Sequence, residues 1–143
     1  MNELLASVNA RFRARPDGLV ELHAAFDRFF AEADGVGAAV GAHDRMAMLT
    51  AAGEIAANIV DHACHDLPNA EVRLALTRMS DRIEASFEDP GAACGEVAHD
   101  DDNPIPHLGI GLTVARASVD ALEYAREGGT NHWRLVRKLG TAT

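Results

Sequence analysis

Alternating apolar and polar positions predict five strands in this chain. Val8, Ala10 and Phe12 alternate with polar residues, which is the period of a strand that buries one face. The same period returns at 72–76 and 83–87, and the sequence MSDR between these runs predicts a hairpin. The sequence LEYAREGGTNHWRLVRKL predicts two further strands joined by a Gly-Gly turn.

Apolar positions three and four residues apart predict three helices. The first follows Pro16, the second runs from about Asp44 to Cys64, and the third opens at the glycines of GIGLTVARASVDAL. The stretch 89–107 contains Gly, Pro and an acidic run, and its lack of apolar periodicity predicts a long loop. The order β-α-α-β-β-loop-α-β-β therefore predicts an α/β two-layer sandwich.

Composition and charge narrow the classes of function. The 143 residues are 48% hydrophobic, which is enough for one globular domain spanning 1–143. A formal net charge of -9 argues against direct binding to nucleic acid or to anionic membranes, which needs clustered Lys and Arg. No apolar run approaches the roughly 20 residues of a membrane span. The N-terminal sequence lacks the apolar stretch of a signal peptide, so we expect a cytoplasmic protein.

The sequence EIAANIVDHACHD, residues 54–66, concentrates groups that could form a metal site. A metal ion would need His62, Cys64 and His65 to point the same way. At 100° per residue, however, His62 and Cys64 point about 160° apart on a helix. A metal site built on these side chains is therefore disfavoured.

The same arithmetic brings four other side chains of this helix together. Glu54, Asn58, Asp61 and His65 fall within about 60° of one another. One interpretation is a solvated helix face. The other is a site in which Glu and Asn, four residues apart, handle Mg²⁺ and a water, because Mg²⁺ prefers hard oxygen ligands. A nearby carboxylate would then orient or deprotonate a hydroxyl group.

Two further motifs suggest a nucleotide. Asp89 follows a strand, where its carboxylate could accept a hydrogen bond from an exocyclic amine such as adenine N6, and Gly91 would let a flat ring approach the backbone. The same residues also suit an ordinary turn. Gly109 and Gly111 stand at a helix start, where exposed N–H groups form an anion site, although many helices begin after glycine.

The three motifs together, in this order along the chain, resemble the ATP-binding domain of the histidine-kinase-like ATPase superfamily, the Bergerat fold. AAGEIAANIVDHA is similar to the first nucleotide motif of the small anti-sigma-factor serine kinases in that superfamily. GIGLTVARASVDALEYAREGGTNHWRLVRKL is similar to their second glycine motif and closing hairpin. The likeness covers about 8–139. It implies a mixed, largely antiparallel sheet covered on one face by about three helices.

The resemblance also implies roles for individual residues, with ATP and Mg as cofactors. Asn58 would hold Mg²⁺, and Glu54 would act as the base on a protein serine hydroxyl. Asp89 would read the adenine amine, with Gly91 beneath the ring. Residues at about 92–108 would form the lid over ATP.

The remaining implied contacts lie near the C-terminus of the domain. Gly109, Gly111 and Leu112 would cradle the phosphates. Thr130, after the Gly-Gly turn, would support the adenine floor.

Two departures from the family pattern bear on catalysis. Ala93 stands where the family usually has a second glycine. No Lys or Arg occurs between Ile83 and Ala115, whereas the predicted lid contains several acidic residues. A transferring phosphoryl group needs positive charge around it. The absence of Lys and Arg therefore argues more strongly against fast phosphoryl transfer than against ATP binding.

Three functions therefore remain open. The first is an anti-sigma factor with serine/threonine protein kinase activity, which sequesters a sigma factor and phosphorylates an anti-sigma-factor antagonist. The second is a non-catalytic, nucleotide-binding partner-switching regulator with a degenerate lid. The third is an α/β interaction domain without nucleotide. The resemblance also implies a homodimer.

Overall fold

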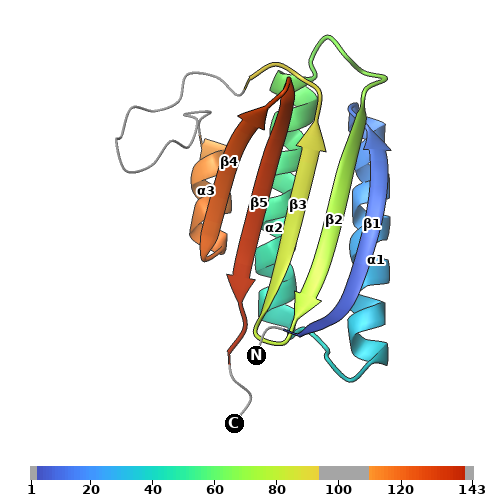
Figure 1. Cartoon of the computed structure of the whole chain (residues 1–143), viewed down its shortest axis with the longest axis vertical. Helices are drawn as coiled ribbons and strands as arrows, with labels where there is room; N and C mark the ends of the chain where they lie inside the picture. The colour runs from blue at the N-terminus through green and yellow to red at the C-terminus, as the bar shows by residue number, and fades with distance from the viewer. Residues whose placement is uncertain (1–2, 94–109, 141–143) are drawn as a thin grey trace.

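Five strands form one antiparallel sheet in the computed structural model, which describes residues 3–93 and 110–140 (Figure 1). The strand order across the sheet is β1-β2-β3-β5-β4, and every neighbouring pair is antiparallel. The strands are β1 (Leu4–Arg13), β2 (Glu71–Met79), β3 (Arg82–Asp89), β4 (Ala121–Glu127) and β5 (Thr130–Lys138).

Three α-helices cover the same face of this sheet, behind the strands in Figure 1. They are α1 (Leu19–Gly35), α2 (Ala42–Asn58) and α3 (Ile110–Ser118). A 3-10 turn, η1 (Pro16–Gly18), precedes α1, and a π-helical turn, η2 (Ile59–Ala63), continues α2. The predicted two-layer α/β sandwich is confirmed, and its sheet is antiparallel throughout the described strands.

The core lies between the sheet and the helices, because each strand alternates buried and more exposed side chains. In β3, for example, Ile83, Ala85 and Phe87 are fully buried, whereas the residues between them are half-buried on the opposite face. The largest fully buried side chains are Trp133, Phe26, Phe29, Phe87, Leu22, Met48, Ile55, Ile59, Leu74, Leu76, Ile83 and Leu135.

The hairpin between β4 and β5 turns at two glycines with left-handed backbone. Gly128 has φ +58° and Gly129 has φ +80°, a conformation that favours glycine and matches the twist of a two-residue hairpin. This turn and the pairing of β5 with β3 place Asn131 directly opposite Asp89. The register therefore brings the end of β3 to the start of β5.

The predicted helix 44–64 is regular only as far as Asn58. Beyond it, Cys64 N–H donates to the Ile59 carbonyl at 2.8 Å, the five-residue bond of a π turn. A constant rotation of 100° per residue therefore fails beyond Asn58, and the predicted stripe divides there. Asp61 and His65 are exposed.

None of the described helices is long and apolar enough to span a membrane.

Candidate functional site

The π turn η2 meets the segment that follows β3 through main-chain contacts. Ala92 N–H donates to the Ala63 carbonyl at 2.8 Å. A Cβ added to Gly91 would lie 2.4 Å from that carbonyl oxygen and 2.8 Å from Cys64 Sγ. Only glycine fits here without moving backbone, so the structure explains Gly91 by its approach to Ala63.

Asp89 lies in this junction with its two carboxylate oxygens in different environments. Oδ1 accepts hydrogen bonds from Gly91 N–H at 2.9 Å, Asn131 Nδ2 at 3.0 Å and Cys64 Sγ at 3.7 Å. Burial first, and then the Asp89 carboxylate beside it, raise the pKa of the Cys64 thiol to about 12, so the thiol stays protonated and can donate.

The other oxygen, Oδ2, is buried and has no hydrogen-bond partner in the described part of the chain. Asp89 is only 1% exposed. Because an unpaired buried acceptor costs about 1–3 kcal/mol, this oxygen is a natural acceptor for a donor supplied by a ligand.

Glu54 and Asn58 lie one turn apart on α2, as predicted. Asn58 is buried, and its Nδ2 has no partner among the described residues. Two of the three buried side-chain atoms without a described partner therefore belong to predicted site residues, and the third is Trp133 Nε1. The Asn58 Nδ2 group is thus available to donate to an anion, and an amide oxygen is the kind of atom that can bind a cation.

The Glu54 carboxylate lies against the first turn of α3. A Cβ on Gly111 would lie 2.5 Å from Glu54 Oε2. Helix N-termini carry partial positive charge and free N–H groups, so this carboxylate marks a position that also suits a phosphate. The Leu112 side chain is 4% exposed and belongs to the hydrophobic core, which leaves its main chain for any ligand contact.

No cluster of three or more His, Cys, Asp or Glu side chains that could hold a metal occurs within 3–93 and 110–140. A metal ion at α2 would therefore share its ligands between Asn58 and a bound phosphate, the mode that Mg²⁺ commonly adopts. Gly109 and all of the predicted lid except Ala92 and Ala93 lie outside the described residues.

The profile of the histidine kinase-like ATPase domain matches residues 12–137. The chain belongs to the histidine kinase-like ATPase family. The fold agrees with this membership. A similar solved structure contains the RsbU and RsbW domains of Rv1364c from Mycobacterium tuberculosis, with a TM-score of 0.60 and 17% identity.

The alignment covers 92% of this ATPase-family chain and 32% of the Mycobacterium tuberculosis chain. The present chain therefore spans about a third of the length of that solved protein. At this identity the likeness shows the fold alone. No curated protein matches the sequence.

In this histidine kinase-like ATPase domain, Thr130 and its neighbour Asn131 both lie close to Asp89. Thr130 lines a pocket of about 360 Å³ together with Asp89, Glu88 and Pro90. Its neighbour Asn131 points to the helix-covered side and contacts Asp89. Sequence reasoning missed Asn131, because the pairing of β3 with β5 that places it there joins residues 42 apart.

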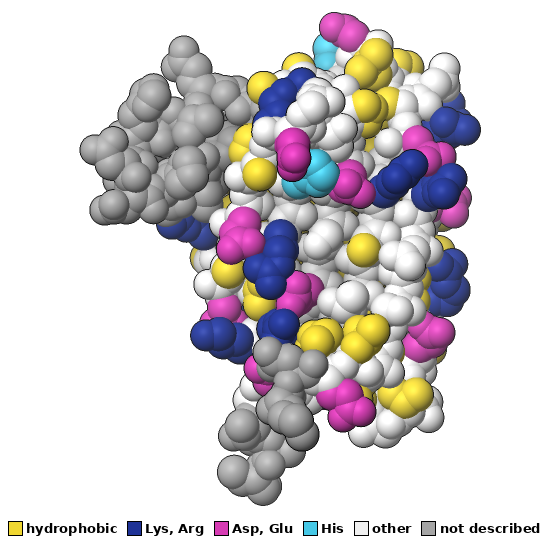
Figure 2. Space-filling model, in the orientation of Figure 1, with side chains coloured by type: hydrophobic (Ala, Val, Ile, Leu, Met, Phe, Trp, Pro, Cys, Tyr) yellow, Lys and Arg dark blue, Asp and Glu magenta, His cyan; other side chains and the backbone are white. Residues whose placement is uncertain are grey.

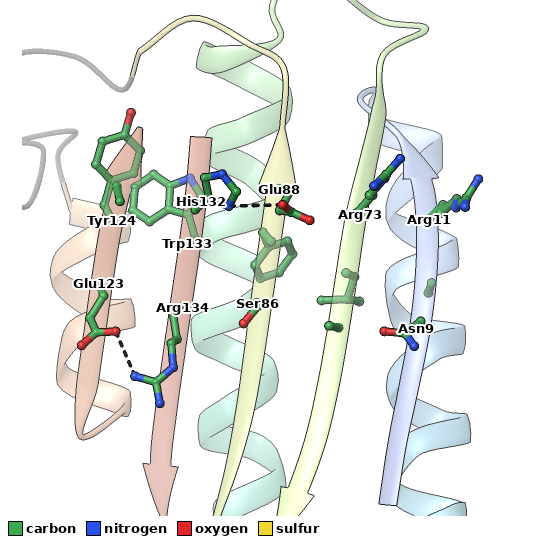
Figure 3. A pocket seen from close by; sticks show the side chains of 15 residues that line it. Asn9, Arg11, Arg73, Ser86, Glu88, Glu123, Tyr124, His132, Trp133 and Arg134 are labelled. Carbon is green, nitrogen blue, oxygen red and sulfur yellow. Dashed lines mark hydrogen bonds and ion pairs between the residues drawn. The ribbon is translucent and has the colours of Figure 1, made fainter. Parts of the chain in front are cut away.

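A hollow of about 820 Å³ in the ATPase-family domain lies on the sheet face away from the helices. Polar contacts cross it: His132 Nδ1 lies 3.2 Å from the Glu88 carboxylate, and Arg134 forms an ion pair with Glu123 at 2.9 Å (Figure 3). Figure 2 shows charged side chains of both signs over this face. None of the predicted nucleotide-site residues lines the hollow, so it is separate from the candidate site.

Proposed function

We propose that this chain is an ATP-binding anti-sigma factor that phosphorylates a serine or threonine of an anti-sigma-factor antagonist. Membership of the histidine kinase-like ATPase family implies the nucleotide. The observation that carries the proposal is the Asp89 carboxylate, which has one oxygen saturated by donors and the other buried without a described partner.

The adenine end of the site consists of Asp89, Gly91 and Asn131. Asp89 Oδ2 can only accept a hydrogen bond while the carboxylate is ionised, so it requires a donor on the base. Adenine presents an N6 amine, whereas guanine presents the O6 acceptor. The carboxylate therefore favours ATP over GTP, because a buried oxygen facing another acceptor stays unpaired.

The phosphate end consists of Glu54, Asn58 and Gly111. It lies roughly 15 Å from the adenine end along α2 and η2, since ten residues separate Glu54 from Cys64 beside Asp89. An extended nucleotide would lie along this helix, with its phosphates toward the first turn of α3.

The Asn58 amide oxygen would hold Mg²⁺, which prefers hard oxygen ligands. Bound Mg²⁺ supplies positive charge against the phosphates. The Glu54 carboxylate would accept the proton of the acceptor hydroxyl. The hydroxyl oxygen then forms a bond to the γ-phosphorus, the bond to the β–γ bridging oxygen breaks, and ADP leaves.

The nucleotide site is tested by thermal unfolding with and without Mg·ATP and Mg·ADP. A ligand at 100 times its dissociation constant stabilises the native state by about 2.7 kcal/mol. We expect wild type and Glu88→Gln to shift and Asp89→Asn not to shift. Glu88 is the matched control because it is the neighbouring carboxylate on the opposite face of β3. The absence of any shift in folded wild type would refute the nucleotide site.

Kinase activity needs a separate experiment. Radiolabelled γ-phosphate should pass from ATP to a candidate antagonist, and Glu54→Gln should abolish transfer while Mg·ATP still binds. Binding without transfer in wild type would favour the non-catalytic partner-switching regulator instead. Light scattering tests the proposed homodimer, and co-purification with candidate sigma factors tests the proposed target.

A further inference from the structure

Asn131 is the side chain that ties Asp89 to its surroundings. It is 0% exposed. Its Nδ2 donates to Asp89 Oδ1 at 3.0 Å and to the Ala92 carbonyl at 2.8 Å. Its Oδ1 accepts from Arg126 Nη1 at 2.8 Å and from the Tyr124 hydroxyl at 2.5 Å. One amide therefore joins β3, the segment after it, and the β4–β5 hairpin.

Arg126 sets the orientation of this amide. A guanidinium can only donate hydrogen bonds, so the oxygen of Asn131 must face Arg126 and its nitrogen must face Asp89. Arg126 Nη1 also donates to the Gly91 carbonyl at 2.9 Å, which fixes the guanidinium itself. The amide cannot flip without facing its NH₂ group toward a cation.

This orientation determines which oxygen of Asp89 is left for a ligand. With a donor from Asn131, a second from Gly91 and a third from Cys64, Oδ1 is saturated. The carboxylate is thereby held against rotation, and Oδ2 is the oxygen that has no partner among residues 3–93 and 110–140. Loss of the Asn131 donor would release one side of that clamp and leave Oδ1 partly unpaired.

We propose that Asn131, oriented by Arg126, is a positioning residue that gives the site its selectivity for nucleotides with a 6-amino group on the purine. This inference rests on the proposed nucleotide function and goes beyond it, because the selectivity is assigned to residues that need not touch the base. A merely structural Asn131 would hold the main chain at 91–92, and its loss would weaken every nucleotide equally.

The test compares two ligands that differ only in the amine. Dissociation constants for Mg²⁺ with ATP and with purine riboside 5′-triphosphate, which lacks the 6-amino group, are measured by calorimetry. We expect wild type to bind ATP at least about 10-fold more tightly, as one hydrogen bond to a charged group would give. Asn131→Ala should lower this preference for ATP to about 2-fold. Arg126→Met, which keeps an apolar stem, should lower the wild-type preference by a factor of about three.

The matched control is His132→Ala, on the next residue of β5 and the opposite face, where it pairs with Glu88. It should keep the wild-type ratio. An unchanged ratio in Asn131→Ala, or equal weakening of both ligands, would overturn the proposal. Should Asn131→Ala not fold, the exposed Arg126 decides alone, and an unchanged ratio in Arg126→Met overturns it.

The binding behaviour of wild type distinguishes a failure of the proposed nucleotide function from a failure of the role proposed for Asn131. Wild type that binds neither ligand refutes the proposed nucleotide function and this inference together. Wild type that prefers ATP, beside variants that keep the preference, refutes this inference alone.

Discussion

Replacing Gly111 by alanine should slow phosphoryl transfer without lowering the free energy of unfolding. Gly111 is the second residue of α3, where alanine is a better helix former by about 0.5–1 kcal/mol. The new methyl would lie 2.5 Å from Glu54 Oε2, whereas ordinary contact begins at 3.4 Å, so the carboxylate must move. The end of a flexible side chain can move cheaply, so we expect the free energy of unfolding to stay level or rise.

The rate of phosphoryl transfer should fall instead. The displacement forced on the Glu54 carboxylate is about 0.9 Å, from the difference between these two distances. A catalytic group misplaced by about 1 Å can cost on the order of 100-fold in rate. We expect phosphoryl transfer by Gly111→Ala to fall at least about 10-fold, with ATP selectivity unchanged because the adenine end is untouched.

Urea unfolding and the transfer rate, measured on the same preparations, check both halves of this prediction. Gly53→Ala is the control, because Gly53 precedes Glu54 on α2 and an added Cβ there meets nothing within 4 Å. Gly53→Ala should raise the free energy of unfolding by about 0.5–1 kcal/mol and leave the rate of phosphoryl transfer unchanged. A Gly111→Ala variant that loses more than about 1 kcal/mol of stability, or keeps a rate within about threefold of wild type, would refute the reasoning.

Three further predictions follow from the same contacts. Gly91→Ala should lower the free energy of unfolding by about 1–3 kcal/mol or more in urea, because its methyl meets main-chain atoms of η2 that cannot move aside; stability equal to wild type would contradict this. Burial raises the pKa of Glu84, but hydrogen bonds from Arg82 and Arg134 outweigh it and leave the pKa below its usual value. This carboxylate therefore stabilises the fold above its unfolded-state pKa and loses that contribution as the pH falls through the folded-state value, so Glu84→Gln should flatten the acid side of a stability profile. Chelation of Mg²⁺ should weaken ATP binding through repulsion by the Glu54 carboxylate, and Glu54→Gln should recover part of the metal-free affinity in calorimetry; equal weakening in both proteins would place Glu54 away from the phosphates.

The strands and helices were predictable because their signals are local. The two-residue period of β3 and the amphipathic spacing of α1 each arise within one element, and both are confirmed. The position of Glu54 one turn before Asn58 follows from the same local rule.

Two features escaped prediction because they depend on distant parts of the chain. The π turn η2 adds a residue to a helix whose sequence reads as regular, and contacts with Gly91 and Ala92 accompany it. The contact of Asn131 with Asp89 depends on strand register across the sheet, and a shift by one residue would turn the Asn131 side chain to the other face.

The π turn makes the number of residues between Asn58 and Cys64 part of the site. Deleting a single residue there would restore regular helical bonding and rotate everything beyond it by about 100°. The Ala63 carbonyl would then leave Ala92, and the Cys64 thiol would leave Asp89. A shorter and more regular helix would therefore lose the contacts that hold Asp89 and the segment after it. The irregular π turn is what allows these residues to meet.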